Sequence, residues 1–109
     1  MIKKDLNFEV DLDENHLPIS IEMNASDVAV NQKDIKALMI SAWAAKNQET
    51  LRIDLWTKDM PLNDMFIMYH QTMMAMATTL EKATGQEKLA GALRDYCDFF
   101  AEQTNIKEG

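Results

Sequence analysis

The sequence predicts an α+β fold, because two kinds of apolar periodicity follow one another along its 109 residues. Apolar and polar residues alternate near the amino terminus, which is typical of half-buried strands, whereas apolar residues recur every three or four positions in the second half, which is typical of helices. A chain of this length with 47% hydrophobic residues can bury one core without a metal or a disulfide. We therefore expect a single domain over residues 1–109.

Two strands open the chain and are expected to form a hairpin. Residues 6–12 alternate strictly, residues 17–23 resume the alternation, and the polar turn "DENH" separates them. Pro18 has no N–H to donate to a neighbouring strand, which places the second strand at a sheet edge.

The next segment changes period and predicts a helix that ends near Lys46 or Asn47. Its residues at helical spacing are Ile35, Leu38, Met39, Ala42 and Trp43. A third strand follows over residues 50–57, with Leu51, Ile53 and Leu55 on its buried side.

Two helices are expected to close the chain. The first begins at Leu62 and ends near Gly85, and Thr84 with Glu87 has the spacing of a capping box for the second. The inward stripe of the first comprises Leu62, Met65, Phe66, Tyr69, Met73, Met76 and Leu80. The stripe of the second comprises Leu89, Leu93, Tyr96, Cys97 and Phe100.

Methionines are abundant in the long helix and have two interpretations. Met65, Met73 and Met76 lie on the predicted stripe and are expected to fill the core. Met68 and Met74 fall off the stripe, so they are candidates for the seat of the last helix or for a subunit contact, because thioethers repack easily against partners.

The predicted order is strand, strand, helix, strand, helix, helix. Because the first helix returns the chain to the turn end of the hairpin, the third strand can run antiparallel beside the first, in spatial order 2-1-3. The expected architecture is a three-stranded antiparallel sheet with helices packed on one face, and its other face open.

Charge and cysteine content exclude several classes of function. The formal charge is −7 and most of the excess lies in the first thirty residues, which disfavours nucleic acid and anionic membrane surfaces as partners. The single cysteine, Cys97, cannot form an intramolecular disulfide. With no signal peptide recognisable at the amino terminus, we expect a cytoplasmic protein without a membrane-spanning segment.

No metal, cofactor or catalytic site is predicted. The turn "DLDENH" resembles a calcium loop, but His16 stands where that loop requires glycine. His70 has no second histidine at helical spacing, and the acids next to Cys97 would raise a thiol pKa, so Cys97 is expected to be buried and inert.

The third strand carries the candidate interaction surface, which consists of Arg52, Asp54 and Trp56. Their alternation with the buried residues turns a large tryptophan outward beside an arginine, and these two residue types are enriched as anchors of protein interfaces. The alternative is an indole that lies over its own sheet or beneath the "KDMP" loop.

The segments "RIDLWTKDMP", "HQT" and "RDYCDFFAE" resemble the GldC family of gliding-motility accessory proteins of gliding bacteria, and the likeness runs nearly end to end. This resemblance implies a small cytoplasmic protein that assists gliding and has no known enzymatic activity, cofactor or catalytic residue.

Two functions follow as hypotheses. The first is a non-enzymatic interaction module whose partners are protein components of the gliding machinery, with homo-oligomers also open. The alternative is a small-ligand binder or enzyme with a pocket between the sheet and the long helix near Tyr69 and His70.

Overall fold

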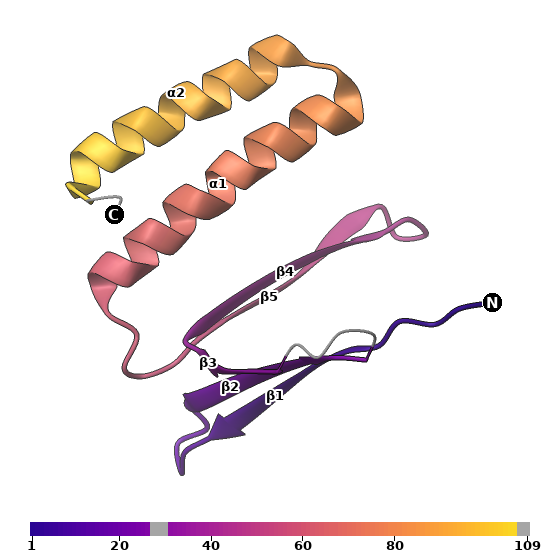
Figure 1. The fold of residues 1–109 in the computed structure, drawn as a ribbon, viewed down its shortest axis with the longest axis vertical. Coiled ribbons are helices and arrows are strands. Elements are labelled where there is room, and N and C mark those ends of the chain that lie inside the picture. The colour runs from indigo at the N-terminus through magenta and orange to yellow at the C-terminus, as the bar shows by residue number, and fades with distance from the viewer. Residues whose placement is uncertain (27–30, 107–109) are drawn as a thin grey trace. The chain divides into compact units, whose positions relative to one another are not determined.

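The computed structural model describes residues 1–26 and 31–106, and confirms the α+β class. The chain forms two compact units, residues 1–60, which contain all the strands, and residues 61–109, which contain both helices (Figure 1). The expectation that the helices cover a sheet face stays a prediction.

The first sheet contains three antiparallel strands in the order β1-β2-β3. They are β1 (Leu6–Leu12), β2 (Pro18–Ala25) and β3 (Asn31–Ile35). Ile21 of β2 pairs with Val10 of β1 on one side and Ile35 of β3 on the other, and it is fully buried. The predicted hairpin and its turn are therefore confirmed, and Ile21 is the centre of this sheet's core.

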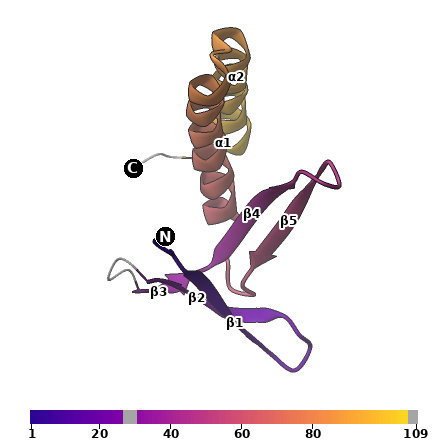
Figure 2. The same ribbon diagram turned by 90° about the vertical axis from the view of Figure 1, so that its right-hand side faces the viewer.

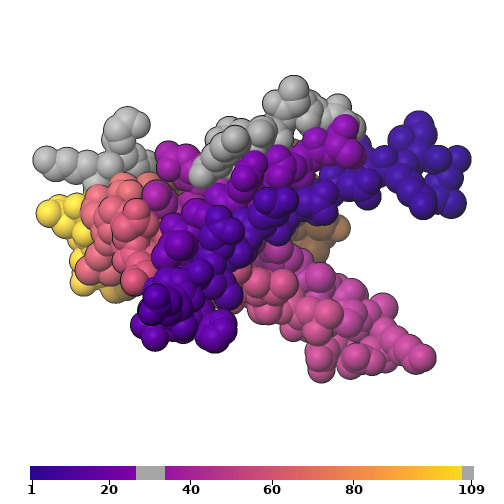
Figure 3. All heavy atoms as spheres, turned by 90° about the horizontal axis from the view of Figure 1, so that it is seen from below, coloured from indigo at the N-terminus to yellow at the C-terminus, as the bar shows by residue number. Residues whose placement is uncertain are grey.

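The second sheet is a hairpin of β4 (Ala37–Ala44) and β5 (Glu49–Trp56). The antiparallel register is continuous from the pair Ala37 and Trp56 to the pair Ala44 and Glu49. Only Lys36 separates β3 from β4, so the chain passes directly from one sheet to the other. Figure 2 shows that the two sheets are separate. The turn over residues 45–48 forms the free end of the hairpin (Figure 3).

The helix predicted around residues 35–47 is wrong, because this segment forms the end of β3, the whole of β4 and the following turn. Its sequence "ALMISAWA" satisfies both periods, since nearly every position is apolar or small. Pairing with β5 decides between them: Leu38, Ile40 and Ala42 lie opposite Leu55, Ile53 and Leu51 on one face of the hairpin. Tertiary pairing therefore overrides an ambiguous local pattern.

The predicted strand order 2-1-3 is also wrong. The strand over residues 49–56 exists nearly as predicted, but it pairs with β4 and not with β1. Pro18 likewise belongs to a central strand, because β2 lies between β1 and β3. The ladder tolerates it because Pro18 is the first residue of β2, and the β3 pairing begins only at Ile21.

The helices α1 (Leu62–Thr84) and α2 (Glu87–Thr104) confirm the prediction for the second half of the chain. Gly85 ends α1 in the left-handed conformation, with φ of 70°, and its N–H donates to the carbonyl of Glu81 at 2.8 Å. The two helices pack as an antiparallel hairpin in which Ala77 of α1 and Ala90 and Cys97 of α2 are fully buried.

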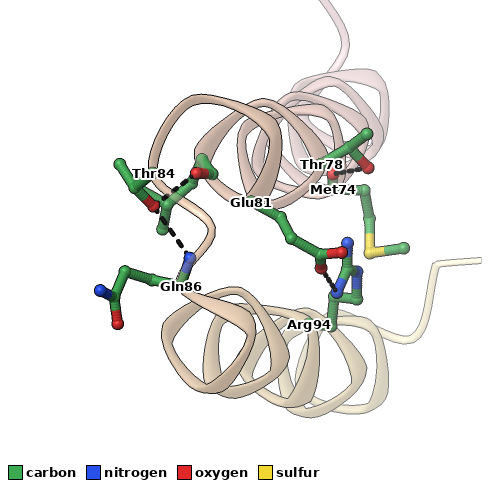
Figure 4. Close-up of polar contacts among 7 residues, drawn as sticks. Met74, Thr78, Glu81, Thr84, Gln86 and Arg94 are labelled. Atoms are coloured by element: carbon green, nitrogen blue, oxygen red, sulfur yellow. Dashed lines mark hydrogen bonds and ion pairs between the residues drawn. The ribbon is translucent and has the colours of Figure 1, made fainter.

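An aromatic contact and an ion pair are among the contacts that join the two helices. The rings of Phe66 and Phe100 meet edge to face, with centroids 6.2 Å apart. Arg94 of α2 donates to the carboxylate of Glu81 of α1 at 3.0 Å (Figure 4). The Arg94–Glu81 ion pair is about 40% exposed on each side, so it contributes little stability.

The predicted capping box of the last helix does not form. Gln86, not Thr84, is the residue before α2, and no side chain caps the helix. Thr84 instead donates its hydroxyl proton to the carbonyl of Leu80 and accepts from the N–H of Gln86 (Figure 4). Because Gly85 inserts a left-handed turn, Thr84 belongs to the end of α1 rather than to the start of α2.

Several residues predicted to be buried are half exposed. On the β4–β5 hairpin they are Leu51 and Ile53, and on the helices they are Leu62, Tyr69, Met76, Leu89 and Tyr96. The register with β4 confirms that Leu51, Ile53 and Leu55 share one face, but the prediction that this face is buried is wrong for Leu51 and Ile53.

Candidate interaction face on the β4–β5 hairpin

The candidate site lies on the second face of the β4–β5 hairpin, which carries both tryptophans. Antiparallel pairing places the outward residues of the two strands on one surface, which we call the tryptophan face. Its members are Met39, Ser41, Trp43, Thr50, Arg52, Asp54 and Trp56. The three residues predicted as an interaction surface are therefore together, and the structure adds Trp43 to them.

Both indoles are available for contact. Trp43 is 64% exposed and Trp56 is 58% exposed, although large aromatic side chains usually lose most of their exposure on folding. Trp43 pairs with Thr50 near the tip and Trp56 pairs with Ala37 at the base, so the two levels are six residue steps apart along the strand, or roughly 20 Å. The two tryptophans thus lie at opposite ends of the face, with the polar residues between them.

Arg52 occupies that centre in a fixed orientation. Its guanidinium donates to the hydroxyl of Ser41 on β4 and forms an ion pair with the carboxylate of Asp54 on its own strand. The pair is about half exposed, so its net stabilisation is small. The two contacts restrain the Arg52 guanidinium on the tryptophan face, which reduces the entropy lost when a partner binds.

A small apolar pocket adjoins Trp56. Its volume is about 240 Å³, and its lining combines the end of β5 with the start of β2. The lining residues are Leu17, Pro18, Asp54, Leu55, Trp56 and Lys58. The N–H of Lys58 donates to the carbonyl of Pro18 at 3.0 Å, which ties the two walls together. A pocket of this size suits one or two side chains of a peptide rather than a cofactor.

Asp13, in the β1–β2 turn, also binds Lys58 and so helps to hold the segment after β5 beside β2. Its carboxylate accepts from the ammonium of Lys58 at 2.8 Å and from the N–H groups of Asn15 and Leu17 at 2.8 and 3.0 Å. The hydrogen bond from Lys58, followed by that from Leu17, lowers the pKa of Asp13 below its usual value. The turn that resembles a calcium loop therefore acts as a structural clamp between β2 and the segment after β5.

We expect the Asp13 clamp to make stability depend on acid. Because the folded state lowers the pKa of Asp13, its stabilisation is present above the unfolded pKa of about 4 and is lost as pH falls through the lower folded value. Asp13→Asn should lower the melting temperature at pH 7, and the difference from wild type should close in strong acid. The exposed neighbour Glu14 supplies the control, Glu14→Gln; an equal loss in both variants would contradict the clamp.

Metal binding is not supported by the arrangement of the turn. Asp13 is engaged by Lys58, and Asp11 accepts from the hydroxyl of Ser20 at 2.9 Å. No group of three acidic, histidine or cysteine side chains suitable for a metal occurs among the described residues. We predict that dialysed protein retains no stoichiometric calcium or zinc and that a chelator leaves its melting temperature unchanged; a chelator-dependent shift would contradict this.

Cys97, Tyr69 and His70 differ in how far their side chains are buried. Cys97 is fully buried, and burial, with a smaller contribution from Asp98, raises the pKa of its thiol. Tyr69 is 45% exposed whereas His70 is buried, as neighbouring helix positions point about 100° apart. The two side chains that would build a ligand pocket therefore diverge.

Trp43 and the pocket escaped sequence reasoning for different reasons. Trp43 lies at helical spacing from Met39, yet the alternation of Met39, Ser41 and Trp43 in the same segment is a strand signal that places Trp43 on this face. The pocket has no local signal, because Leu17 and Lys58 meet only through the fold.

Comparison with known proteins decides the family. The family model for gliding motility-associated proteins described as GldC-like matches residues 18–106, which include the whole of β2, the tryptophan face and both helices. The chain belongs to the GldC-like family. This confirms the resemblance found in the sequence, and it places the tryptophan face inside the region that defines the family. No curated protein and no solved structure gives a match to this GldC-like chain.

Within the described part of this GldC-like chain, neither helix combines the length and the apolar composition that a membrane crossing requires.

Proposed function

We propose that this GldC-like chain is a non-enzymatic, cytoplasmic interaction module of the gliding machinery, and that the tryptophan face is its contact surface for a protein component of that machinery. Family membership supplies the link to gliding motility. The observation that carries the contact surface is the exposure of both Trp43 and Trp56 on one face, on either side of Arg52.

The composition of this face favours a protein partner. Tryptophan and arginine contribute a disproportionate share of binding energy at protein interfaces, and anchors that lie apart on a flat strand surface match an extended or sheet-like partner better than a small ligand. Arg52 supports recognition of a carboxylate or a backbone carbonyl between the anchors. The pocket beside Trp56 would receive one apolar side chain of the partner.

The chemistry of Cys97 supports both the absence of enzymatic activity and the cytoplasmic compartment. The strongest nucleophile, Cys97, has a raised thiol pKa and no exposed surface, so it is inert. A buried, unpaired thiol suits a reducing compartment.

The test is the double variant Trp43→Ala with Trp56→Ala. We expect a fall of at least tenfold in the amount of specific partner that the tagged chain retains from an extract of a gliding bacterium, because each anchor contributes about 2 kcal/mol. Cells that carry only this variant should glide more slowly. Both side chains are exposed, so the melting temperature should change little.

A matched control separates this function from the alternative. Leu51→Ala truncates a side chain of similar exposure on the opposite face of the same hairpin and should leave partner retention unchanged. If gliding and retention survive loss of both tryptophans but fail in Tyr69→Phe, the ligand-binding alternative replaces the interaction module.

A further inference from the structure

The chain crosses between the two sheets of residues 1–60 at a single residue, Lys36. Strand β3 ends at Ile35 and strand β4 begins at Ala37. Within the described residues, no backbone ladder pairs a strand of one sheet with a strand of the other. Because a few backbone dihedrals at such a joint can act as a hinge, other contacts must fix the angle between the two sheets.

Residues 57–60, which directly follow β5, return to this crossing point, and we call them the brace. The N–H of Thr57 donates to the carbonyl of Lys36 at 2.8 Å, and the N–H of Met60 donates to the carbonyl of Thr57 at 3.1 Å. Thr57 is polar but only 1% exposed. Its hydroxyl group therefore needs a partner inside the protein.

The carboxylate of Asp59 supplies that partner and a second contact. One of its oxygens, Oδ1, accepts from the hydroxyl of Thr57 at 2.7 Å, and the other, Oδ2, accepts from the ammonium of Lys36 at 3.1 Å. These two hydrogen bonds, that from Thr57 first, lower the pKa of Asp59 below its usual value. One carboxylate thus bridges the buried residue of the brace and the residue at which the chain changes sheets.

The brace also reaches the first sheet through Lys58. The N–H of Lys58 donates to the carbonyl of Pro18 at the start of β2, and its ammonium donates to the carboxylate of Asp13 in the β1–β2 turn. Because the brace continues directly from β5, its other end belongs to the second sheet. Four residues therefore connect the second sheet to the first at the crossing point and at the start of β2.

The pocket beside Trp56 depends on this connection, because its walls come from different sheets. Leu17 and Pro18 lie at the start of β2, whereas Leu55 and Trp56 lie at the end of β5. Neither sheet forms the pocket alone. A change in the angle between the sheets would move these walls apart or together.

The contacts of the Asp59 carboxylate differ in strength. The ion pair with Lys36 is 40% exposed on the lysine side and 65% exposed on the aspartate side, so it contributes little by itself. The hydrogen bond from Thr57 matters more, because a buried hydroxyl without its partner is penalised. We propose that Thr57, Asp59 and Lys36 are positioning residues, whose shared carboxylate bridge fixes the angle between the two sheets and preforms the pocket.

The brace goes beyond the proposed function, because it sets the geometry of residues 1–60 whether or not a partner binds. A preformed pocket lowers the ordering cost of any side chain that enters it. The test below contains only the chain itself. Failure of the brace is therefore distinguishable from failure of the tryptophan face as a contact surface.

The distance between two spin labels, one on each sheet, reports the angle between the sheets. Glu9→Cys on β1 and Glu49→Cys on β5 supply exposed attachment sites, and Cys97→Ala removes the native thiol from the full chain. Pulsed electron paramagnetic resonance then measures the distribution of label distances. We expect one narrow distribution when the brace is intact.

Variants of the brace should broaden this distribution. Thr57→Val keeps the shape of the side chain without its hydroxyl, and Asp59→Asn removes the charge that binds Lys36; each should widen the distribution about twofold or more. Thr57→Ser keeps the hydroxyl and should retain the narrow distribution. Asp34→Asn is the control of equal charge, because Asp34 lies 4.0 Å from the ammonium of Lys36 but is 92% exposed.

A second measurement reads the pocket directly. Trp43→Phe leaves Trp56 as the one tryptophan of the sequence, so 5-fluorotryptophan incorporated there gives a single fluorine resonance. We expect a narrow line that Asp59→Asn shifts or broadens. Circular dichroism checks that each variant is folded, and Asp59→Asn decides the matter if Thr57→Val unfolds.

Several outcomes overturn the proposal. A broad distribution with the brace intact, or a narrow one in both Thr57→Val and Asp59→Asn, would show that the brace does not fix the angle. Equal broadening by Asp34→Asn would assign the effect to charge near Lys36 in general, and equal broadening by Thr57→Ser would assign it to packing. An unchanged fluorine line in Asp59→Asn would show that the pocket does not depend on the brace.

Discussion

Ile21→Ala is expected to lower the free energy of unfolding of residues 1–60 by about 2–5 kcal/mol, a large fraction of what holds a small protein folded. Ile21 has no exposed surface, and its cross-strand neighbours are Val10 and Ile35. Truncation removes most of the side chain and leaves a cavity where three strands meet. Because β2 is paired on both sides, neither neighbouring strand can move in to fill this cavity.

Urea unfolding followed by tryptophan fluorescence measures this effect, because both tryptophans lie in residues 1–60. Ile19→Ala is the matched control, since Ile19 belongs to the same strand and is 48% exposed. Its loss should be about half as large or less. Equal midpoints for the two variants would show that the core of this sheet is not centred on Ile21.

The sequence was informative wherever one period stood alone. In β1 and β2, polar residues occupy nearly every second position, so only a strand satisfies the pattern, and the observed pairing of Val10 with Ile21 follows from it. In α1 the apolar run is too long for a strand, and Gly85 supplies the conformation needed to end the helix.

The sequence failed where neither period was excluded. Residues 37–44 contain Ser41 as their only polar side chain, so a helical stripe and a strand alternation both fit. The competition was decided by β5, whose Leu51, Ile53 and Leu55 offer a complementary apolar row. This one error also produced the wrong strand order, because without β4 the last strand had only β1 to pair with.

Burial was the least predictable property of the candidate surfaces. Periodicity predicted which way Arg52, Asp54 and Trp56 face, since facing is fixed by alternation alone. It could not tell which of two adjacent positions on α1 becomes buried, because this helix is apolar on several sides. His70 and Ala77 are buried, whereas the residues just before them, Tyr69 and Met76, are exposed. Which of these positions becomes buried depends on where α2 packs against α1.

Ala77→Asp is expected to separate the helical hairpin. Ala77 is fully buried, and an introduced carboxylate would lie there one turn from Glu81, which Arg94 of α2 already pairs with. Glu81, one turn later, adds repulsion between like charges. An uncompensated buried charge typically costs about 3–5 kcal/mol, which is a large fraction of the stability of a small protein.

Loss of helical circular dichroism on heating or in urea measures this effect. Thr78→Asp places the same charge on the adjacent, exposed position and should cost no more than about 0.5 kcal/mol. Because burial favours the protonated carboxyl, the destabilisation by Ala77→Asp should diminish as pH falls, whereas a purely steric clash would not respond to pH. Equal stability of the two variants at neutral pH would mean that Ala77 does not lie in the contact between α1 and α2.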